Sequence, residues 1–350
     1  MSQTVLSEFD IALLDFVRDH PHLSSKEIYD AMKSPVSYPT LKRALARSIE
    51  QNLLVKTGTR KSTKYQVSPA YDLFYPISAE SYFDRETEDR IIKVNFQVDL
   101  INTILKNAEI LSPEEANHLE NLHAIFVKKI SGLSPSSYAK EMERLAIDLS
   151  WKSSQIEGNT YSLLETEFLL KEKISSSVKE KSDAIMLLNH KTAIDFILEH
   201  TSYLHPLSIS KIEDIHSILI KDLGVDRNLR KRRVGISGTN YIPPDNEHQT
   251  RSAMEDLCVL VNSRESAYEK ALLILVLISY IQPFVDGNKR TARIISNAIL
   301  VHHGYCPLSF RTVSPLEYKK AMLIFYEQNN ILPAKKMFIE QVEFAVRTYF

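Results

Sequence analysis

The stretch from Ile281 to Arg293, which reads IQPFVDGNKRTAR, constrains the fold of this chain more than any other. A strongly apolar run, 271–281, leads into it, and a run with helical apolar spacing, 294–301, follows it. Pro283 disfavours helical geometry at the residue before it, so the first helix is expected to stop there. Gly287 tolerates the backbone angles that a tight entry into a second helix requires. The stretch therefore predicts a helix, a short loop and a second helix.

Three cations, Lys289, Arg290 and Arg293, occupy the start of that second helix. A helix N-terminus already carries about half a unit of positive charge, and each added cation costs about 0.3–1 kcal/mol there. Free backbone N–H groups together with three cations fit an anion-binding site. Asp286, just before the turn, would be suited to hold Mg²⁺ alongside substrate phosphates. The alternative is a loop whose cations simply face water.

This stretch resembles the signature of Fic-domain proteins, in which His, any residue, Phe, any residue, Asp or Glu, and Gly-Asn precede Gly, Arg, two further residues and a second Arg. The matching positions are Phe284, Asp286, Gly287, Asn288, Arg290 and Arg293. Two positions depart from the signature, because Gln282 replaces the His and Lys289 replaces the second Gly. The Lys variant resembles the death-on-curing branch of the superfamily, whose motif reads Asn-Lys-Arg.

The resemblance places Gln282 in the position of the general base. In the family this base takes a proton from a target hydroxyl as the hydroxyl attacks the α-phosphate of ATP and receives AMP. A histidine titrates near neutral pH, whereas an amide hydrogen-bonds but cannot accept the proton. Base catalysis is typically worth about 10²–10⁴-fold, so AMP transfer is expected to be strongly weakened unless another residue substitutes.

The resemblance also implies roles for the rest of the motif. These are the α-phosphate for Asn288 and the Gly287 backbone, the β- and γ-phosphates for Arg290 and Arg293, and Mg²⁺ for Asp286. Lys289 joins this nucleotide-binding set but leaves the reaction open. In the death-on-curing branch the same residue accompanies a reversed nucleotide and phosphate transfer, but that branch keeps its His. AMP transfer and phosphate transfer both stay as alternatives.

A second motif, Ser150 to Asn159, lies near the end of a helix expected over 136–157. Ser153 and Glu157 are four residues apart and share one helix face. The motif resembles the inhibitory motif of Fic proteins, Ser or Thr, three residues, Glu, then Gly or Asn. In the family this Glu pairs with the second arginine of the signature, here Arg293, and blocks the γ-phosphate position. A partly buried, bidentate pair of this kind is expected to be strong.

Val234–Tyr241 alternates like a strand and is interrupted by two glycines, which predicts a short hairpin. It resembles the Fic flap, a β-hairpin over the active site that holds the target segment by strand addition. Gly238, Thr239 and Tyr241 are expected to lie closest to that target. Arg230, just upstream, matches an arginine often found there in the family and is expected to be structural.

Residues 1–70 predict three helices and a two-stranded hairpin, which resembles a winged helix-turn-helix domain. Between Val36 and Tyr65 there are seven basic residues against one acidic residue. The third helix and the wing would contact duplex DNA through Tyr38, Thr40, Lys42, Arg43, Arg60 and Lys61. The alternative is a solvated basic face on a domain that contacts protein.

The expected fold class is mainly α, a Fic-type helical core with a β-hairpin flap plus the N-terminal winged-helix domain. The expected domains are 1–70, a helical connector over 71–135, the core with its inhibitory helix over 136–330, and a C-terminal helix over 331–350. The formal net charge of −1 gives no global signal for nucleic acid. The two cysteines, Cys258 and Cys306, indicate a reducing compartment such as the cytoplasm. The apolar run 271–281 is too short to span a membrane.

Three function hypotheses follow. The first is an enzyme that transfers AMP from ATP, with Mg²⁺, to a Ser, Thr or Tyr hydroxyl of a target protein, inhibited by Glu157. The second is a catalytically silent regulator that binds DNA and responds to ATP or ADP. A Fic-derived scaffold that binds neither tightly is the third reading. Family members often dimerise, which makes a homodimer one expectation for the assembly.

Overall fold

The computed structural model describes residues 7–33, 36–173 and 179–350, apart from the side chain of Lys61. The chain divides into two compact units, Met1–Pro76 and Ile77–Phe350. Both contain buried apolar side chains that form a core of their own. Among the described helices none combines the length and the apolar character that crossing a bilayer requires.

The first unit consists of three helices followed by an antiparallel hairpin. Its elements are α1 (Glu8–Asp19), α2 (Ser25–Ala31), α3 (Tyr38–Glu50), β1 (Leu54–Thr57), the 3₁₀ turn η1 (Arg60–Ser62), β2 (Lys64–Val67) and α4 (Pro69–Leu73). The strands pair from Leu54 opposite Val67 to Thr57 opposite Lys64. This order of elements agrees with a winged helix, an assignment that stays a prediction.

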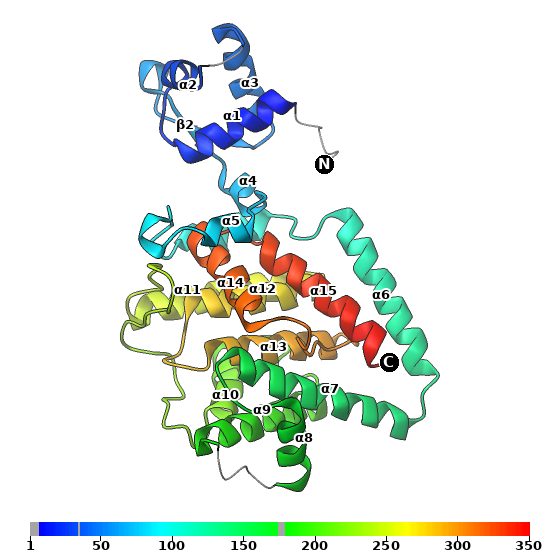
Figure 1. The fold of residues 1–350 in the computed structure, drawn as a ribbon. Coiled ribbons are helices and arrows are strands. Elements are labelled where there is room, and N and C mark those ends of the chain that lie inside the picture. The colour runs from blue at the N-terminus through cyan, green and yellow to red at the C-terminus, as the bar shows by residue number, and fades with distance from the viewer. Residues whose placement is uncertain (1–6, 34–35, 174–178) are drawn as a thin grey trace. The chain divides into compact units, whose positions relative to one another are not determined.

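The second unit is almost entirely helical, which confirms the expected fold class (Figure 1). Its elements are α5 (Ala79–Phe83), the 3₁₀ turn η2 (Thr87–Asp89), the π-helical turn η3 (Leu100–Leu105), α6 (Pro113–Ser131), α7 (Pro135–Ile156), α8 (Leu163–Glu172), α9 (Lys181–Glu199), α10 (Ile209–Leu219), α11 (Glu247–Ser263), α12 (Ala267–Ile281), α13 (Asn288–His302), α14 (Pro315–Gln328) and α15 (Leu332–Thr348). Capping boxes formed by Ser112 with Glu115 and by Ser314 with Glu317 begin α6 and α14.

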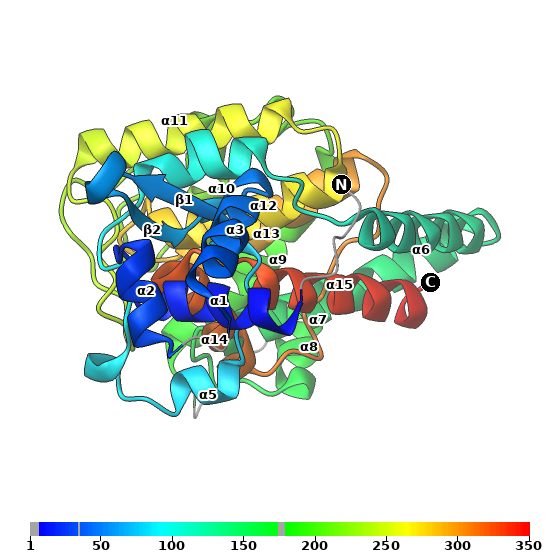
Figure 2. The same cartoon turned by 90° about the horizontal axis from the view of Figure 1, so that it is seen from above.

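The helix pair α12 and α13 lies at the centre of this unit. Almost every side chain of α12 is buried, because the run 271–281 is apolar on all sides of the helix. α11, α14 and α15 pack against α12, while α7, α9 and α10 pack against α13 (Figure 1). Seen from above, α6 runs beside α15 at the edge of the unit (Figure 2). The loop between α12 and α13 is thus held by helices on both sides.

The hairpin expected over 234–241 is wrong. The segment contains a turn at Ser237–Gly238 but no paired strands. At its end the Ile242 N–H donates to the Val94 carbonyl (2.7 Å), and the Ile242 carbonyl accepts from the Phe96 N–H (3.1 Å). The backbone groups that would close a local hairpin therefore bond to the connector, which is extended between Arg90 and Gln97. We call 234–242 the flap segment.

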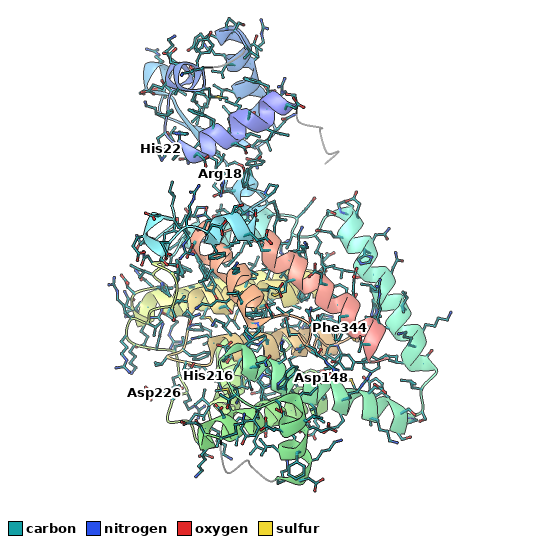
Figure 3. The ribbon with its side chains drawn as sticks, viewed as in Figure 1. Arg18, His22, Asp148, His216, Asp226 and Phe344 are labelled. Carbon is teal, nitrogen blue, oxygen red and sulfur yellow. The ribbon has the colours of Figure 1, made fainter. Side chains whose placement is uncertain are left out.

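The end of the chain is tied to α7 by a buried carboxylate, Asp148 (Figure 3). The Tyr349 hydroxyl donates to Asp148 Oδ2 (2.5 Å), and the Arg311 guanidinium donates to the same oxygen (3.0 Å). Burial of the ring and the hydrogen bond to Asp148 raise the pKa of Tyr349, so the hydroxyl stays protonated and donates. This contact joins α7 to the chain end that follows α15.

We expect Tyr349→Phe to lower the free energy of unfolding by about 1–3 kcal/mol, because a buried carboxylate loses one donor. Urea unfolding followed by the fluorescence of Trp151, the one tryptophan of the chain, measures this. Tyr305→Phe is the control, since its hydroxyl bonds to the exposed Glu120 (3.1 Å). Its effect should stay below about 0.5 kcal/mol. Equal losses in the two variants would contradict the assignment.

Candidate functional site

The loop between α12 and α13 is organised by one asparagine side chain. Asn288 Oδ1 accepts from the Phe284 N–H (2.8 Å), and Asn288 Nδ2 donates to the Phe284 carbonyl (2.9 Å). Two residues in left-handed backbone geometry bracket this staple, Gln282 at the end of α12 (φ 50°) and Gly287 before α13 (φ 79°). A Cβ on Gly287 would also lie 3.2 Å from the Ile220 side chain. The predicted helix–loop–helix arrangement is confirmed.

The Gln282 side chain completes this staple and points away from solvent. Its Nε2 donates to the Ser279 carbonyl (2.6 Å), and its Oε1 accepts from Asn288 Nδ2 (2.9 Å). Only 9% of Gln282 is exposed, although it borders the cavity described below. Both ends of the amide are therefore engaged in hydrogen bonds that hold the loop, and neither end can take up a proton as a general base.

A buried histidine that the sequence did not single out supports the loop from α10. His216 stacks on Phe284 with ring centroids 3.6 Å apart. Its Nδ1 and Nε2 lie 3.0 Å from the carbonyls of Arg227 and Asp286, respectively. Burial lowers the pKa of His216 against the opposing effect of these two carbonyls. The ring lies between the two carbonyls as a spacer that fixes the position of the Asp286 carbonyl, and no local sequence pattern marks it.

The two arginines of the motif are buried and face different partners. Arg290 is 1% exposed and Arg293 is 0% exposed. Arg290 Nη2 donates to Asp286 Oδ2 (3.1 Å), which leaves the Asp286 carboxyl largely exposed at 64%. Arg293 Nε donates to Ser153 Oγ (2.8 Å), and its Nη2 donates to the Ser153 carbonyl (2.9 Å). The alternative in which these guanidinium groups face water is therefore excluded.

Glu157 lies at the start of α13, where the sequence predicted an anion. Arg293 Nη2 donates to Glu157 Oε1 (2.8 Å), and Lys289 Nζ donates to Glu157 Oε2 (3.3 Å). The expected bidentate pair is wrong, because only Arg293 Nη2 reaches the carboxylate and Lys289 bonds to the second oxygen. Arg293 Nε donates to Ser153, and Arg293 Nη1 makes no hydrogen bond within the described part of the chain. Burial alone would raise the pKa of Glu157, but Arg293 and Lys289 outweigh it and lower that pKa. The carboxylate is thus charged at neutral pH.

Ser153 connects this ion pair to a second buried histidine. Because Ser153 Oγ accepts from Arg293, its hydroxyl proton is free to go to His190 Nε2, 2.6 Å away. Burial, followed by the Arg293 and Arg290 charges, lowers the pKa of His190 well below its ordinary value. A neutral His190 is what this hydrogen bond requires, since a protonated ring would have no lone pair for the serine.

These groups border a cavity of about 330 Å³, which lies within the usual size range of small-molecule sites. Its lining is formed by Ile156, Glu157, Gly235, Ile236, Ser237, Gln282, Val285, Asp286, Gly287, Asn288, Lys289, Lys319, Met322, Leu323 and Tyr326. α13 begins without a side-chain cap, so its first N–H groups are oriented toward this region. Lys319, on α14, adds a cation that sequence reasoning missed.

The residues present fit a nucleotide with Mg²⁺ better than a metal held by protein alone. Among the described residues, no group of three or more His, Cys, Asp and Glu side chains is placed to hold a metal. Asp286 offers one exposed carboxylate, which suits an ion that takes most of its ligands from phosphates and water. The cation-rich start of α13 suits the phosphates.

The flap segment borders the cavity with residues other than those expected. Gly235, Ile236 and Ser237 line it, whereas Tyr241 is 2% exposed and donates its hydroxyl to the Tyr280 carbonyl (3.0 Å). The expectation that Tyr241 contacts a target is therefore wrong, because stacking on Tyr280 places its ring in the core. Thr239 instead caps the turn by accepting from the Tyr241 N–H (3.0 Å).

Arg230 fixes both ends of the flap segment to the loop. It is 2% exposed and donates to the carbonyls of Gln282 (2.6 Å), Arg232 (2.8 Å) and Pro244 (2.6 Å). Its own N–H donates to the Pro283 carbonyl (2.9 Å). A fork of donors is needed for three carbonyls, which explains why an arginine occupies this position.

In the first unit, most of the residues expected to bind DNA are exposed. These are Thr40, Lys42, Arg43 and Arg60. Tyr38 is half-buried, with its hydroxyl 2.9 Å from Ser25 Oγ, and the Lys61 side chain lies outside the described residues. Two other basic side chains of the same face are paired with acids, in Arg47–Asp10 (2.5 Å) and Lys64–Glu27 (2.7 Å). The basic charge that no described acid compensates therefore lies mainly on α3, at Lys42 and Arg43.

Comparison with known proteins identifies the central part of the second unit. The model of the Fic/DOC family matches residues 206–300. A protein adenylyltransferase Fic of Nematostella vectensis is 29% identical over 167 residues, which are 46% of this chain and 39% of that protein. One of Drosophila willistoni is 29% identical over 174 residues, or 45% of this chain and 32% of that protein. The chain thus spans about two fifths of these relatives or less.

Solved structures give the same fold. Fic-1 of C. elegans, residues 134–508, superposes with a TM-score of 0.60 at 19% identity and covers 67% of this chain and 72% of its own. A Fic family protein of Desulfovibrio desulfuricans superposes with a TM-score of 0.57 at 19% identity, covering 68% and 74%. The helix–loop–helix with its buried arginines lies within residues 206–300, and this part of the chain is a Fic domain by its match to the Fic/DOC family.

Proposed function

We propose that this chain binds a nucleoside triphosphate at the start of α13 and that Glu157 competes with the triphosphate for this position. The carboxylate held by both Arg293 and Lys289 is the observation that carries the proposal. A buried guanidinium, a lysine and an uncapped helix N-terminus form an anion site that an internal anion fills. A phosphate group offers the same cations more charge and more acceptor oxygens than one carboxylate.

The proposed reaction is slow transfer of AMP from ATP to a Ser, Thr or Tyr hydroxyl of a target protein. The relatives named protein adenylyltransferase support this reaction class. ATP with Mg²⁺ would supply the electrophilic α-phosphate and the pyrophosphate leaving group. Asn288 and the Gly287 N–H would orient the α-phosphate, and Asp286 would hold the metal. A cytoplasmic location fits both the supply of ATP and two reduced cysteines.

One observation favours the silent alternative. The Gln282 amide completes the Asn288 staple, so the loop keeps its phosphate-binding shape without a titratable group. A chain of this kind would bind ATP or ADP and report it to a partner without chemistry. The two readings differ in rate and not in the position of the nucleotide.

We expect Glu157→Gly to tighten ATP binding about tenfold or more, because a competing buried carboxylate is removed. Adding Gln282→His should raise transfer by about 10²–10⁴-fold over Glu157→Gly alone. Calorimetry measures binding, and ATP labelled at the α- or γ-phosphate, incubated with Mg²⁺ and a cell lysate, separates AMP transfer from phosphate transfer.

Glu172→Gly, at the exposed end of α8, is the control and should leave binding unchanged. Transfer by Glu157→Gly alone would support the enzyme, whereas transfer only after His is restored would support the silent regulator. If Glu157→Gly binds ATP no better than the parent, the anion site itself is refuted.

We also propose that α3 of the first unit contacts the phosphates of duplex DNA. Lys42 and Arg43 are exposed on one side of α3, and no ion pair of theirs is present among the described residues. Lys42 Nζ lies 5.9 Å from the centroid of the Tyr38 ring, a contact that leaves its charge uncompensated by any acid that the structure describes. A basic helix face of this kind can exchange its counterions for phosphates.

We expect the double change Lys42→Ala and Arg43→Ala to weaken retention of duplex DNA and to lower the slope of log affinity against log salt by about 2. Filter retention at several salt concentrations measures this. Lys128→Ala with Lys140→Ala removes the same charge from exposed sites in the second unit and is the control. Unchanged retention in the α3 variant would remove DNA from the proposal.

A further inference from the structure

The connector that opens the second unit lies against the flap segment at two points. The first is the backbone pairing of Ile242 with Val94 and Phe96, which fixes the end of the flap segment. The second is a side-chain contact near its turn, where Arg90 Nη2 donates to the Gly238 carbonyl (2.9 Å). Neither the family signature nor the inhibitory motif contains these connector residues.

Arg90 is held by a buried ion pair with α14. Its Nη1 lies 3.3 Å from Glu327 Oε1, and the two side chains are 4% and 0% exposed. Arg90 Nη2 also donates to Thr87 Oγ1 (2.8 Å). The other Glu327 oxygen accepts from the Tyr82 hydroxyl (2.6 Å), so the carboxylate is fixed on both sides. The guanidinium therefore reaches Gly238 from an anchored position.

The face of α14 that carries Glu327 also packs against the turn at Gly238. Lys319, Leu323 and Glu327 are spaced four residues apart and share one helix face. A Cβ on Gly238 would lie 3.4 Å from Lys319 Nζ and 3.8 Å from Leu323 Cδ1, and the backbone there has a φ of 88°. Lys319 and Leu323 line the cavity, together with Gly235, Ile236 and Ser237. The turn is thus held between α14 and Arg90 at the cavity rim.

We propose that Arg90 is a positioning residue for the target protein, and this inference rests on the proposed function. By holding the Gly238 carbonyl, Arg90 fixes the position of the Gly235–Ser237 backbone along the cavity. A target segment would pair with this backbone. A buried ion pair contributes little net stability compared with apolar packing. What the guanidinium adds is a planar fork whose Nη2 donates to the Gly238 carbonyl and to Thr87 Oγ1, while its charge lies beside Glu327.

The test uses the full chain and amide hydrogen exchange, which requires no nucleotide. In Arg90→Met we expect amides of 234–240 to exchange about tenfold faster, because a charged hydrogen bond to the turn is lost. Amides of α13 should not change. Arg90→Lys keeps the charge beside Glu327 but not the second contact, so it should show the same local increase with an unchanged thermal midpoint. This second variant decides the matter if Arg90→Met does not fold.

The functional arm uses the background Glu157→Gly with Gln282→His. Dephosphorylated casein, an unfolded chain with many hydroxyl groups, serves as the acceptor. We expect the KM for casein to rise about tenfold in Arg90→Lys, while the KM for ATP changes less than about twofold, because only the flap segment has moved. Arg264→Lys is the matched control, because Arg264 likewise lies 3.3 Å from a carboxylate, that of Glu269, and donates to a backbone carbonyl, that of Leu105, outside the flap segment.

Three outcomes would overturn the inference. Exchange over 234–240 that matches the parent would show that Arg90 does not hold the turn. Faster exchange that extends equally through α12 and α14 would show a purely structural role. Equal changes in the KM for casein and for ATP would show that the effect is not specific to the target. A background that transfers no AMP refutes the proposed function instead, and the exchange result stands by itself.

Discussion

The charge of Arg293 is the constraint on which the site depends. A guanidinium cannot be deprotonated in a protein, and this one has no exposed surface. It must therefore be surrounded by acceptors, and the structure supplies Ser153 and Glu157, both from α7. Since α7 packs against α9 and α13, the same contacts hold one side of the helical core together. The need to compensate the buried charge of Arg293 therefore also fixes the position of α7.

The acceptors of Arg293 differ in how easily they could be exchanged. Ser153 is fully buried in the last turn of α7 and bonds to a neutral His190, so moving it would break a second buried contact. Glu157 follows the last residue of α7, next to Gly158, and its carboxyl is 20% exposed. A ligand phosphate can therefore replace the carboxylate while the serine contacts stay in place. Displacement needs only the end of the helix to move.

Local chemistry explains what the sequence could predict. Pro283 and Gly287 act on neighbouring residues, so the end of α12 and the start of α13 follow from spacing alone. The conformation of the flap segment could not be predicted in this way, because its pairing partner, Val94–Phe96, lies far away in the sequence. A strand pattern states that a segment seeks a partner but not which one it finds. For the same reason Tyr241 looked like an exposed flap residue and is part of the core.

The role of Arg90 had no sequence signal, since a single arginine in a mixed segment is compatible with any exposed position. Its burial follows from Glu327, which sits on α14 as one acidic residue in an apolar stretch. Buried acids require a partner, so an apolar helix face that carries one carboxylate implies a cation from elsewhere. The sequence contains this requirement, but the three-dimensional fold is needed to show which cation meets it.

Gln282 separates two properties that a histidine at this position would combine. A histidine both shapes the loop and accepts a proton, so its loss in the family would be expected to disturb both. Here the amide donates to Ser279 and accepts from Asn288, which retains the shape and removes only the proton acceptor. Under the proposed function, nucleotide binding is then independent of proton transfer in this chain, because binding would depend on Asn288, Lys289 and Arg293. Glu157 stabilises the chain whether or not it transfers AMP, since without this carboxylate or a bound anion the buried charge of Arg293 would be poorly compensated.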